Sequence, residues 1–203
     1  MAANQTAPHG LNRREVVKIL LADRGSLLVI AGLGAPAWDA TDAGDHPLTF
    51  PLWGGMGGAA AMGLGLALAQ PQRRVLVLTG DGELLMGLSS LATIGAARTT
   101  NLSIVVLDNE RYGETGMQET HTARGVDLAA AAKACGFRVT SMVTTMEQVG
   151  KLRGDIHAVQ GPLLAQVKVA PDKLPLVLPP RDGTHLKNRF REALLGASAH
   201  VQR

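Results

Sequence analysis

Short apolar runs alternate along the chain with segments whose apolar positions recur at helical spacing. Continuous apolar runs over residues 27–31, 75–79 and 102–107 are typical of strands buried on both faces of a parallel sheet. Two further strands are expected over residues 137–143 and 162–169. Because helical segments separate these runs, the pattern predicts an α/β fold with a single doubly wound, mostly parallel sheet flanked by helices.

Local signals predict where the helices begin and end. Asn12 and Glu15 form a capping box before a helix over residues 13–24, which Gly25 ends. Residues 32–51 are rich in Gly, Pro and Asp and are expected to form a loop. The other segments with helical character are residues 57–70, 83–98, 127–135, 145–159 and 184–195.

Two domain segments are expected. Residues 1–170 carry all the predicted strands and form one α/β domain. Residues 171–203 form a C-terminal arm and helix, because residues 171–180 hold four prolines and Thr184 is a candidate cap for the last helix. Five Lys and Arg against two acidic residues make residues 181–203 basic, which indicates a solvated or subunit-facing helix.

Composition excludes several classes of protein. The chain has 203 residues, 46% hydrophobic and 18% charged, which is typical of a globular protein. Aromatic residues make up only 3%, and no nucleic-acid motif accompanies the net charge of +3, so a nucleic-acid partner is not expected. Cys135 is the single cysteine, which excludes an internal disulfide and favours a cytoplasmic location. No apolar stretch is long enough to span a bilayer, and the N-terminus lacks the pattern of a signal peptide.

Polar residues follow two predicted strands at the point where each ends. Asp81 lies between Gly80 and Gly82 after the strand over residues 75–79, and Asn109 lies 28 positions later, after the next strand. In an open parallel sheet these ends meet at the edge where ligands bind. A carboxylate and an amide oxygen suit Mg²⁺, and a helix that begins at Glu83 would point its amino end at a phosphate. The sequence therefore indicates a magnesium–diphosphate site.

The two segments resemble the fingerprint of thiamine diphosphate enzymes. That fingerprint is GDG, about 25 residues and then NN, and here Gly80-Asp81-Gly82 is followed after 25 residues by Asp108-Asn109, with Asp108 in place of the first Asn. The resemblance implies metal ligation by the Asp81 and Asn109 side chains and the backbone carbonyl of Arg111. The cofactor-binding residues that it implies in this part of the chain are Gly80, Asp81, Gly82, Glu83, Asn109, Arg111, Tyr112 and Gly113.

An upstream segment resembles the part of these enzymes that holds the aminopyrimidine ring. Gly54-Gly55-Met56-Gly57 carries this likeness. It implies that Met56 wedges the cofactor into a bent shape and that the Gly54 carbonyl accepts from its 4′-amino group. Met56 as core filler is the alternative.

Residues 50–170 resemble one branch of the family more closely. The stretch LATIGAARTTNLSIVVLDNERYGETGMQETHT is similar to the β subunits of sulfopyruvate and phosphonopyruvate decarboxylases. The resemblance implies thiamine diphosphate and Mg²⁺ as cofactors, and conversion of a small 2-oxo acid to an aldehyde and CO₂. In this family the Glu that activates the cofactor lies on a pyrimidine-binding domain. This chain has no room for one, so the resemblance implies a hetero-oligomer with a pyrimidine-binding α subunit.

The polar segment 112–124 is expected to cover the cofactor. Glu114, Gln118 and His121 are the candidate catalytic residues, for substrate contact or proton relay, and Arg124 is a candidate partner for an anionic group. A solvated loop is the alternative for each of them.

Other functions stay open. A carboligase of the acetolactate synthase type shares every motif described above, and a non-catalytic cofactor-binding subunit would share them too. A 2-oxo acid oxidoreductase would need an iron–sulfur cluster, which one Cys cannot ligate. Gly32-x-Gly34-x-x-Ala37 imitates a dinucleotide fingerprint, but Pro36 lies inside it and no acid follows at about 20 residues.

Overall fold

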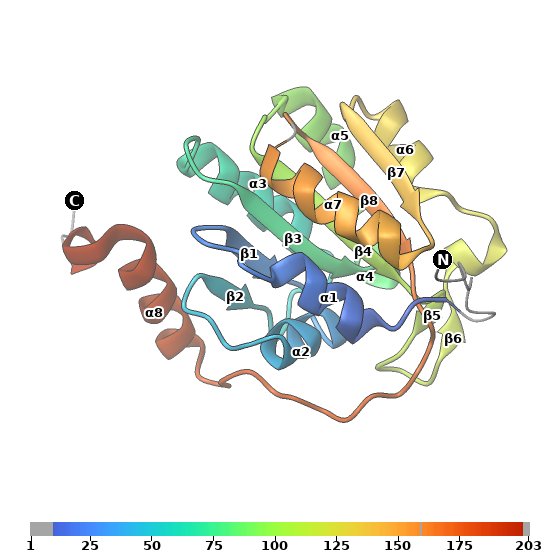
Figure 1. The fold of residues 1–203 in the computed structure, drawn as a ribbon, viewed down its shortest axis with the longest axis horizontal. Coiled ribbons are helices and arrows are strands. Elements are labelled where there is room, and N and C mark those ends of the chain that lie inside the picture. The colour runs from blue at the N-terminus through green and yellow to red at the C-terminus, as the bar shows by residue number, and fades with distance from the viewer. Residues whose placement is uncertain (1–9, 159, 201–203) are drawn as a thin grey trace.

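Six parallel strands form one sheet in the order β2-β1-β3-β4-β8-β7 (Figure 1). The computed structural model describes residues 10–158 and 160–200. The N-terminal segment in which no signal peptide is expected, the predicted helix end at residue 159 and the last three residues lie outside the described part. The strands of this sheet are β1 (Leu28–Ala31), β2 (Thr49–Pro51), β3 (Val75–Gly80), β4 (Leu102–Asp108), β7 (Val139–Val143) and β8 (Leu163–Lys168).

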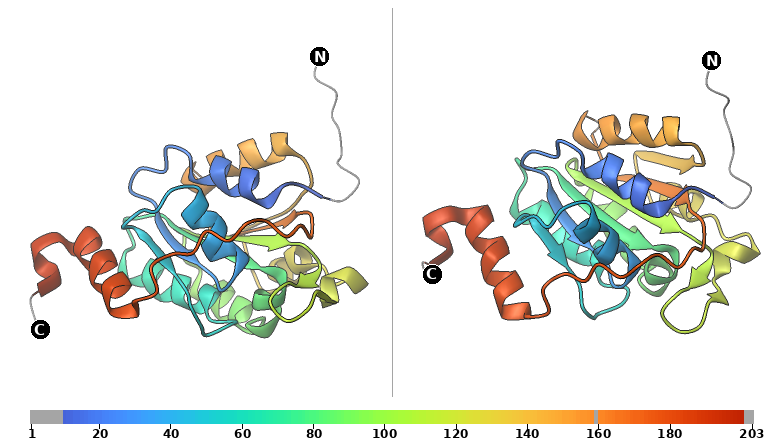
Figure 2. Two further views of the ribbon diagram at one scale, coloured as in Figure 1. Left: turned by 90° about the horizontal axis from the view of Figure 1, so that it is seen from below. Right: turned by 60° about the horizontal axis from the view of Figure 1, so that its bottom comes forward.

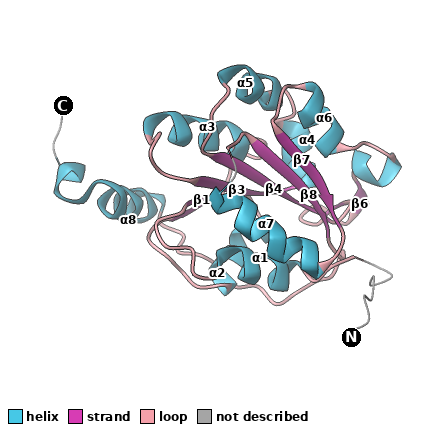
Figure 3. Ribbon diagram, turned by 45° about the horizontal axis from the view of Figure 1, so that its top comes forward, coloured by secondary structure: helices cyan, strands magenta, loops and turns pink. Residues whose placement is uncertain are grey.

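Helices cover both faces of the sheet, which confirms the predicted doubly wound α/β fold (Figure 3). One face carries α1 (Arg13–Leu21), α2 (Ala35–Asp42) and α7 (Met146–Ala158). The other face carries α3 (Ala59–Ala69), α4 (Asp81–Met86), α5 (Ser90–Ala97) and α6 (Leu128–Ala134). A small hairpin of β5 (Arg111–Tyr112) and β6 (Gln118–Glu119) and the 3₁₀ turn η1 (His121–Arg124) follow β4.

The central strands are apolar on both faces because both faces are covered. In β3, Leu76 and Leu78 pack toward α1 and α7, whereas Val75 and Val77 pack toward α3. All four are at most 1% exposed, so β3 is a continuous apolar run with no alternation of polar and apolar positions.

The prediction of a loop over residues 32–51 was wrong. This segment contains α2 and the edge strand β2, whose Thr49 pairs with Val29 of β1. Pro36 lies in the first turn of α2, where a helix does not need the missing N–H group. The proline that favoured a loop is therefore compatible with a helix start.

The prediction of one long helix over residues 83–98 was also wrong. The chain forms two helices, α4 and α5, that are separated at Gly87. A Cβ atom placed on Gly87 would lie 2.1 Å from the carbonyl oxygen of Gly57. The backbones of these two glycines therefore meet, and this close approach coincides with the break between the helices.

The N-cap predicted at Asn12 was confirmed, and the one predicted at Thr184 was wrong. Asn12 accepts from the N–H groups of Arg14 and Glu15 at the start of α1, and Asp127 accepts from Ala130 at the start of α6. The helix α8 (Gly183–Leu195) is capped by Asp182 and not by Thr184, because the Asp182 carboxylate accepts from the N–H groups of its first turn. Several bounds differ by one to three residues; for example, α1 ends at Leu21, α3 begins at Ala59 and β7 begins at Val139.

The C-terminal arm follows β8 past α2 to α8, which projects beyond the β2 edge of the sheet (Figure 2). Phe190 of α8 meets Phe50 of β2 in a T-shaped contact with ring centroids 5.8 Å apart. Arg189 forms an ion pair with Asp45 at 2.6 Å. The last helix therefore packs against the edge strand of its own chain. Within the described residues, no helix is long and apolar enough to cross a membrane.

Candidate active site

The ends of β3 and β4 lie side by side, as the sequence predicts. Gly80, the last residue of β3, is the register partner of Leu107 in β4. Asp81 follows Gly80 directly and Asn109 lies two positions after Leu107, so the two predicted metal ligands leave the sheet at the same edge. Neighbouring strands β1 and β3 lead to connections in opposite directions across the sheet, because β1 continues to β2 on one side and β3 to β4 on the other. Such a switch point is where open α/β sheets bind ligands.

A cavity of about 400 Å³ opens at this edge. It is lined by most of the residues predicted for the cofactor: Met56, Gly80, Asp81, Gly82, Glu83, Asn109, Arg111, Tyr112 and Gly113. The predicted catalytic residue Glu114 also lines it. Gly54 and Gly55 belong to the exposed loop before Met56 and are not in the cavity wall.

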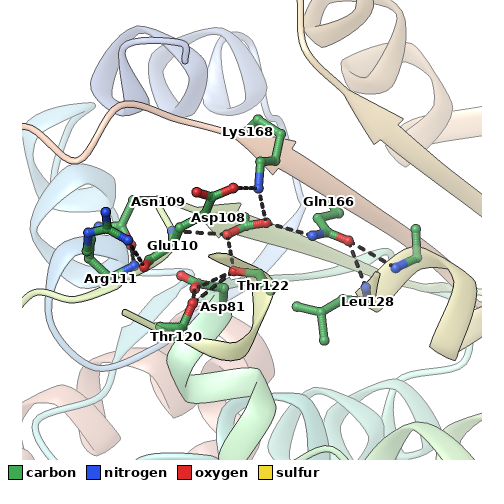
Figure 4. Close-up of polar contacts among 11 residues, drawn as sticks. Asp81, Asp108, Asn109, Glu110, Arg111, Thr120, Thr122, Leu128, Gln166 and Lys168 are labelled. Atoms are coloured by element: carbon green, nitrogen blue, oxygen red, sulfur yellow. Dashed lines mark hydrogen bonds and ion pairs between the residues drawn. The ribbon is translucent and has the colours of Figure 1, made fainter. Parts of the chain in front are cut away.

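Asp81 is buried, and two hydroxyl groups donate to its carboxylate (Figure 4). Thr120 Oγ1 lies 2.5 Å and Thr122 Oγ1 lies 3.1 Å from Asp81 Oδ2. Burial raises the pKa of Asp81 to about 6; the Thr120 hydroxyl opposes this shift and the Asp108 carboxylate adds to it. A cation at this carboxylate would favour its ionised form.

Asp108 and Asn109 point to opposite sides of the strand end (Figure 4). Asn109 lines the cavity, and its Oδ1 accepts from the N–H of Arg111 at 3.0 Å. Asp108 is fully buried and accepts from Gln166 at 2.6 Å and from Lys168 at 2.9 Å. The position that departs from the fingerprint therefore faces away from the cavity.

Glu83 lies between two loops of the site. Its Oε2 accepts from Thr79 Oγ1 at 2.8 Å, and a Cβ atom on Gly32 would lie 1.8 Å from the same oxygen. Burial raises the pKa of Glu83, while the Thr79 hydroxyl and the backbone amides of Leu33, Gly57 and Ala59 lower it. The carboxyl group thus contacts the turn after β1 and the loop that carries Met56.

Close packing explains one glycine of the fingerprint. A Cβ atom on Gly82 would lie 2.5 Å from the ring of Tyr112, so the ring packs directly on the backbone at the start of α4. Only glycine allows this contact without a shift of the ring.

The other loop candidates lie away from the cavity wall. Gln118 exchanges hydrogen bonds with Thr115, and His121 begins the turn η1. Arg124 is 77% exposed and lies 3.5 Å from Glu119. Of the three catalytic candidates only Glu114 lines the cavity, so the roles of Gln118 and His121 stay predictions.

The sequence analysis missed several residues of the cavity wall. They come from α1, from the turn between β1 and α2, and from other strand or helix ends: Arg13, Leu33, Ala35, Pro36, Met86, Leu107, Thr115 and Val169. The Gly32–Ala37 pattern, first considered as a dinucleotide fingerprint, forms this turn between β1 and α2. It was the signal that could have identified Leu33, Ala35 and Pro36.

The donor atoms fit a magnesium–diphosphate pair. The described residues contain no cluster of three His, Cys, Asp or Glu side chains that could hold a metal ion. The predicted site needs none, because one carboxylate, one amide and one backbone carbonyl leave room for phosphate oxygens. The charged residues in the wall are three carboxylates and two arginines, so a diphosphate requires a cation alongside it.

A protein-family model matches more than half of the chain. Residues 34–167 match the family described as "Thiamine pyrophosphate enzyme, C-terminal TPP binding domain". The matched range includes both halves of the fingerprint and the Met56 loop.

Curated relatives point to the same family. The chain is 37% identical over 188 residues to the sulfopyruvate decarboxylase subunit beta of Methanothermobacter thermautotrophicus, which covers 93% of this chain and 98% of that one. It is 38% identical over 146 residues to the phosphonopyruvate decarboxylase of Streptomyces viridochromogenes, covering 72% of this chain and 36% of the relative. Among solved structures, the benzoylformate decarboxylase of Polynucleobacter necessarius matches with a TM-score of 0.69 and 20% identity over 87% of this chain and 36% of that one.

Proposed function

The chain belongs to the thiamine pyrophosphate enzymes, and from that premise we propose that it is the diphosphate-binding subunit of a 2-oxo acid decarboxylase. Its substrate would be a small 2-oxo acid of the sulfopyruvate or phosphonopyruvate type, and its products an aldehyde and CO₂. The single observation that carries this proposal is the common cavity of Asp81, Asn109 and Met56 at the switch point of the sheet. The named relatives supply the substrate class.

Each part of the cavity wall has a role in this proposal. The Asp81 and Asn109 side chains and the Arg111 carbonyl would hold Mg²⁺, and the backbone at Gly80, Gly82 and Gly113 would approach the diphosphate. Met56 would support the bent cofactor, and the Gly54 carbonyl would accept from its amino group. When bound, thiamine diphosphate supplies a carbanion and an electron sink for loss of CO₂ from a 2-oxo acid.

The chain's own contribution to the chemistry is placement and exclusion of water. Leu33, Met56 and Met86 contribute apolar side chains to the cavity wall. A low-dielectric wall disfavours the charged carboxylate of the substrate more than its decarboxylated product. Glu114 lies in the same wall and is the candidate for moving a proton.

A partner subunit completes the proposed enzyme. The Methanothermobacter relative, 98% of which is covered, is itself named a beta subunit, whereas the chain spans only 36% of the phosphonopyruvate decarboxylase of Streptomyces viridochromogenes. We propose that a pyrimidine-binding α subunit supplies the remaining part, including the activating Glu. Residues 1–170 would then be the cofactor domain, and the arm and α8 would contact the partner. Exposed Leu176, Leu178 and Leu195 support this contact.

A product assay tests the proposed function. The full-length chain is expressed with its partner subunit and given sulfopyruvate or phosphonopyruvate with thiamine diphosphate and Mg²⁺. Release of CO₂ with an equal amount of free aldehyde is the expected result. Formation of a coupled hydroxyketone would identify the enzyme as a carboligase. This second candidate function is favoured by 34% identity over 95 residues to an acetolactate synthase large subunit of Escherichia coli. Cofactor binding without turnover of any 2-oxo acid would indicate a non-catalytic subunit.

A further inference from the structure

Arg13 is a buried cation in the wall of the cavity. It lies in the first turn of α1, far in sequence from the fingerprint, and is 6% exposed. Among the described residues that line the cavity, Arg13 and Arg111 are the cations. The Arg111 guanidinium is partly exposed and lies 3.7 Å from Glu119, so it is directed to the outer hairpin. Arg13 is therefore the buried positive charge of this wall.

Two hydrogen bonds fix the position of the Arg13 guanidinium. Its Nε donates to Asp39 Oδ2 at 2.7 Å, and its Nη1 donates to the Asp172 carbonyl in the C-terminal arm at 2.6 Å. Neither contact uses Nη2. Asp39 is shared, because its other oxygen accepts from Arg14 at 3.1 Å. One buried carboxylate thus pairs with two guanidinium groups, although Arg14 also lies 3.6 Å from Asp42.

An acidic residue of the chain itself, Glu114, lies at the turn between β1 and α2. A Cβ atom placed on Gly34 would lie 2.9 Å from Glu114 Oε1, so this carboxyl oxygen packs against Gly34. Gly34 is the residue before α2, a helix of 8 residues whose first N–H groups have no side-chain cap. Burial raises the pKa of the Glu114 carboxyl, and the charge of Arg13 partly opposes this shift. The first turn of α2, which has no side-chain cap, and the buried guanidinium of Arg13 thus line the same cavity.

We propose that Arg13 binds the terminal phosphate of thiamine diphosphate, at the end of the cavity formed by the turn between β1 and α2. This inference rests on the proposed function. In this arrangement the Asp81 and Asn109 side chains would hold the metal, and Arg13 with the amino end of α2 would hold the terminal phosphate. Glu114 is then displaced from Gly34 when the cofactor binds. The arm contributes indirectly, since the Asp172 carbonyl orients the guanidinium.

Equilibrium binding to the full-length chain, assembled with its partner subunit, tests this inference. The two probes are thiamine diphosphate and thiamine monophosphate, each titrated with excess Mg²⁺, and near-ultraviolet circular dichroism checks the fold. Arg13→Gln is expected to weaken binding of the diphosphate about tenfold to hundredfold, since it removes a charge-assisted hydrogen bond. Binding of the monophosphate is expected to change less than about threefold.

Arg14→Gln is the matched control, because Arg14 pairs with the same Asp39 and also contacts the arm, through the Pro175 carbonyl, but does not line the cavity. It should leave the ratio of the two affinities unchanged. If Arg13→Gln does not fold, Arg13→Lys carries the test, with an expected loss of about fivefold for the diphosphate alone.

Two results would overturn the inference. One is that folded Arg13→Gln binds thiamine diphosphate with wild-type affinity. If the KM of this variant for the 2-oxo acid also rises, Arg13 binds the anionic group of the substrate and not the cofactor. Equal losses for both probes would point to a general packing defect. No binding of either probe to the wild-type protein would instead contradict the proposed function itself.

Discussion

Asp108 and Lys168 are register partners at the ends of adjacent strands, and their side chains form an ion pair at 2.9 Å. Asp108 is fully buried, and Lys168 is 28% exposed on its outer side. Lys168 also contacts Glu110, the residue after Asn109. The family fingerprint has an uncharged Asn where this chain has Asp108, and the neighbouring strand supplies the compensating cation. This explains how a second carboxylate fits beside Asp81.

Loss of that cation should destabilise the chain. Lys168→Met leaves Asp108 charged and buried without an opposite charge, and the free energy of unfolding is expected to fall by about 3 kcal/mol. Urea denaturation of the cofactor-free protein measures this change. Adding Asp108→Asn to Lys168→Met should recover most of the loss, because the buried charge is then gone.

A surface pair provides the control for this experiment. Arg153 lies 3.1 Å from Asp23, whose side chain is 91% exposed. Arg153→Met is expected to cost less than about 1 kcal/mol. Equal effects of Lys168→Met and Arg153→Met would show that the buried pair has no special role.

Metal dependence should disappear with the Asp81 carboxylate. Asp81→Asn keeps the volume and can still accept from Thr120, but it removes the charge that a cation requires. Thiamine diphosphate is therefore expected to bind the wild-type protein only with Mg²⁺ present, and this Mg²⁺ effect should be absent in Asp81→Asn. Calorimetric titration with and without a chelator measures both. Because burial of the ionised carboxylate is costly, the metal-free variant should be at least as stable as the wild type. A Mg²⁺ effect that survives in Asp81→Asn would place the metal elsewhere.

The sequence predicted the parts of the site that follow directly from local patterns. Buried apolar runs identified β3 and β4, and the polar residues after them identified Asp81 and Asn109. A capping side chain such as Asn12 is equally local, because it bonds to the next residues of the same helix.

Contacts set by strand order could not be predicted in this way. Arg13 lines the cavity because α1 packs on the face of the sheet next to α2, and Lys168 meets Asp108 because β8 lies between β4 and β7. The break between α4 and α5 also depends on a contact between distant segments, because the backbone of Gly87 packs against the backbone of Gly57 in another loop. Such contacts depend on the assembled fold and not on spacing along the chain.

A mildly acidic pH should weaken the docking of β2 through His46. The Leu48 N–H donates to His46 Nδ1 at 3.1 Å, which requires a neutral ring. Burial, and then the charges of Arg24 and Arg189, lower the pKa of His46 from its ordinary 6.5, and Asp45 partly opposes them. Below pH 6.5, the ordinary pKa of His46, the unfolded chain binds more protons at this residue than the folded chain. The contribution of His46 to stability is therefore fully present above pH 6.5, and it is lost as the pH falls through the lowered pKa of the folded state.

The measurement is the free energy of unfolding as a function of pH in the wild type and in His46→Gln. The wild type should lose more stability between about pH 7 and about pH 5, because the variant has no group at this position that titrates there. Parallel curves for the two proteins would mean that His46 has the same pKa folded and unfolded.

Met56 should control the reactivity of the cofactor more than its binding. The side chain lines the cavity and is 38% exposed, so truncation opens space without disturbing the core. Met56→Ala is expected to bind thiamine diphosphate and Mg²⁺ within about threefold of the wild type, because the diphosphate end supplies most of the contacts. Exchange of the cofactor's C2 proton with deuterium, followed by NMR after acid quench, should slow by about tenfold to hundredfold, since the bent geometry is no longer enforced. Met62→Ala is the control, because Met62 is similarly exposed at 41% but does not line the cavity. If both variants exchange the proton at the wild-type rate, Met56 is only a filler of the wall.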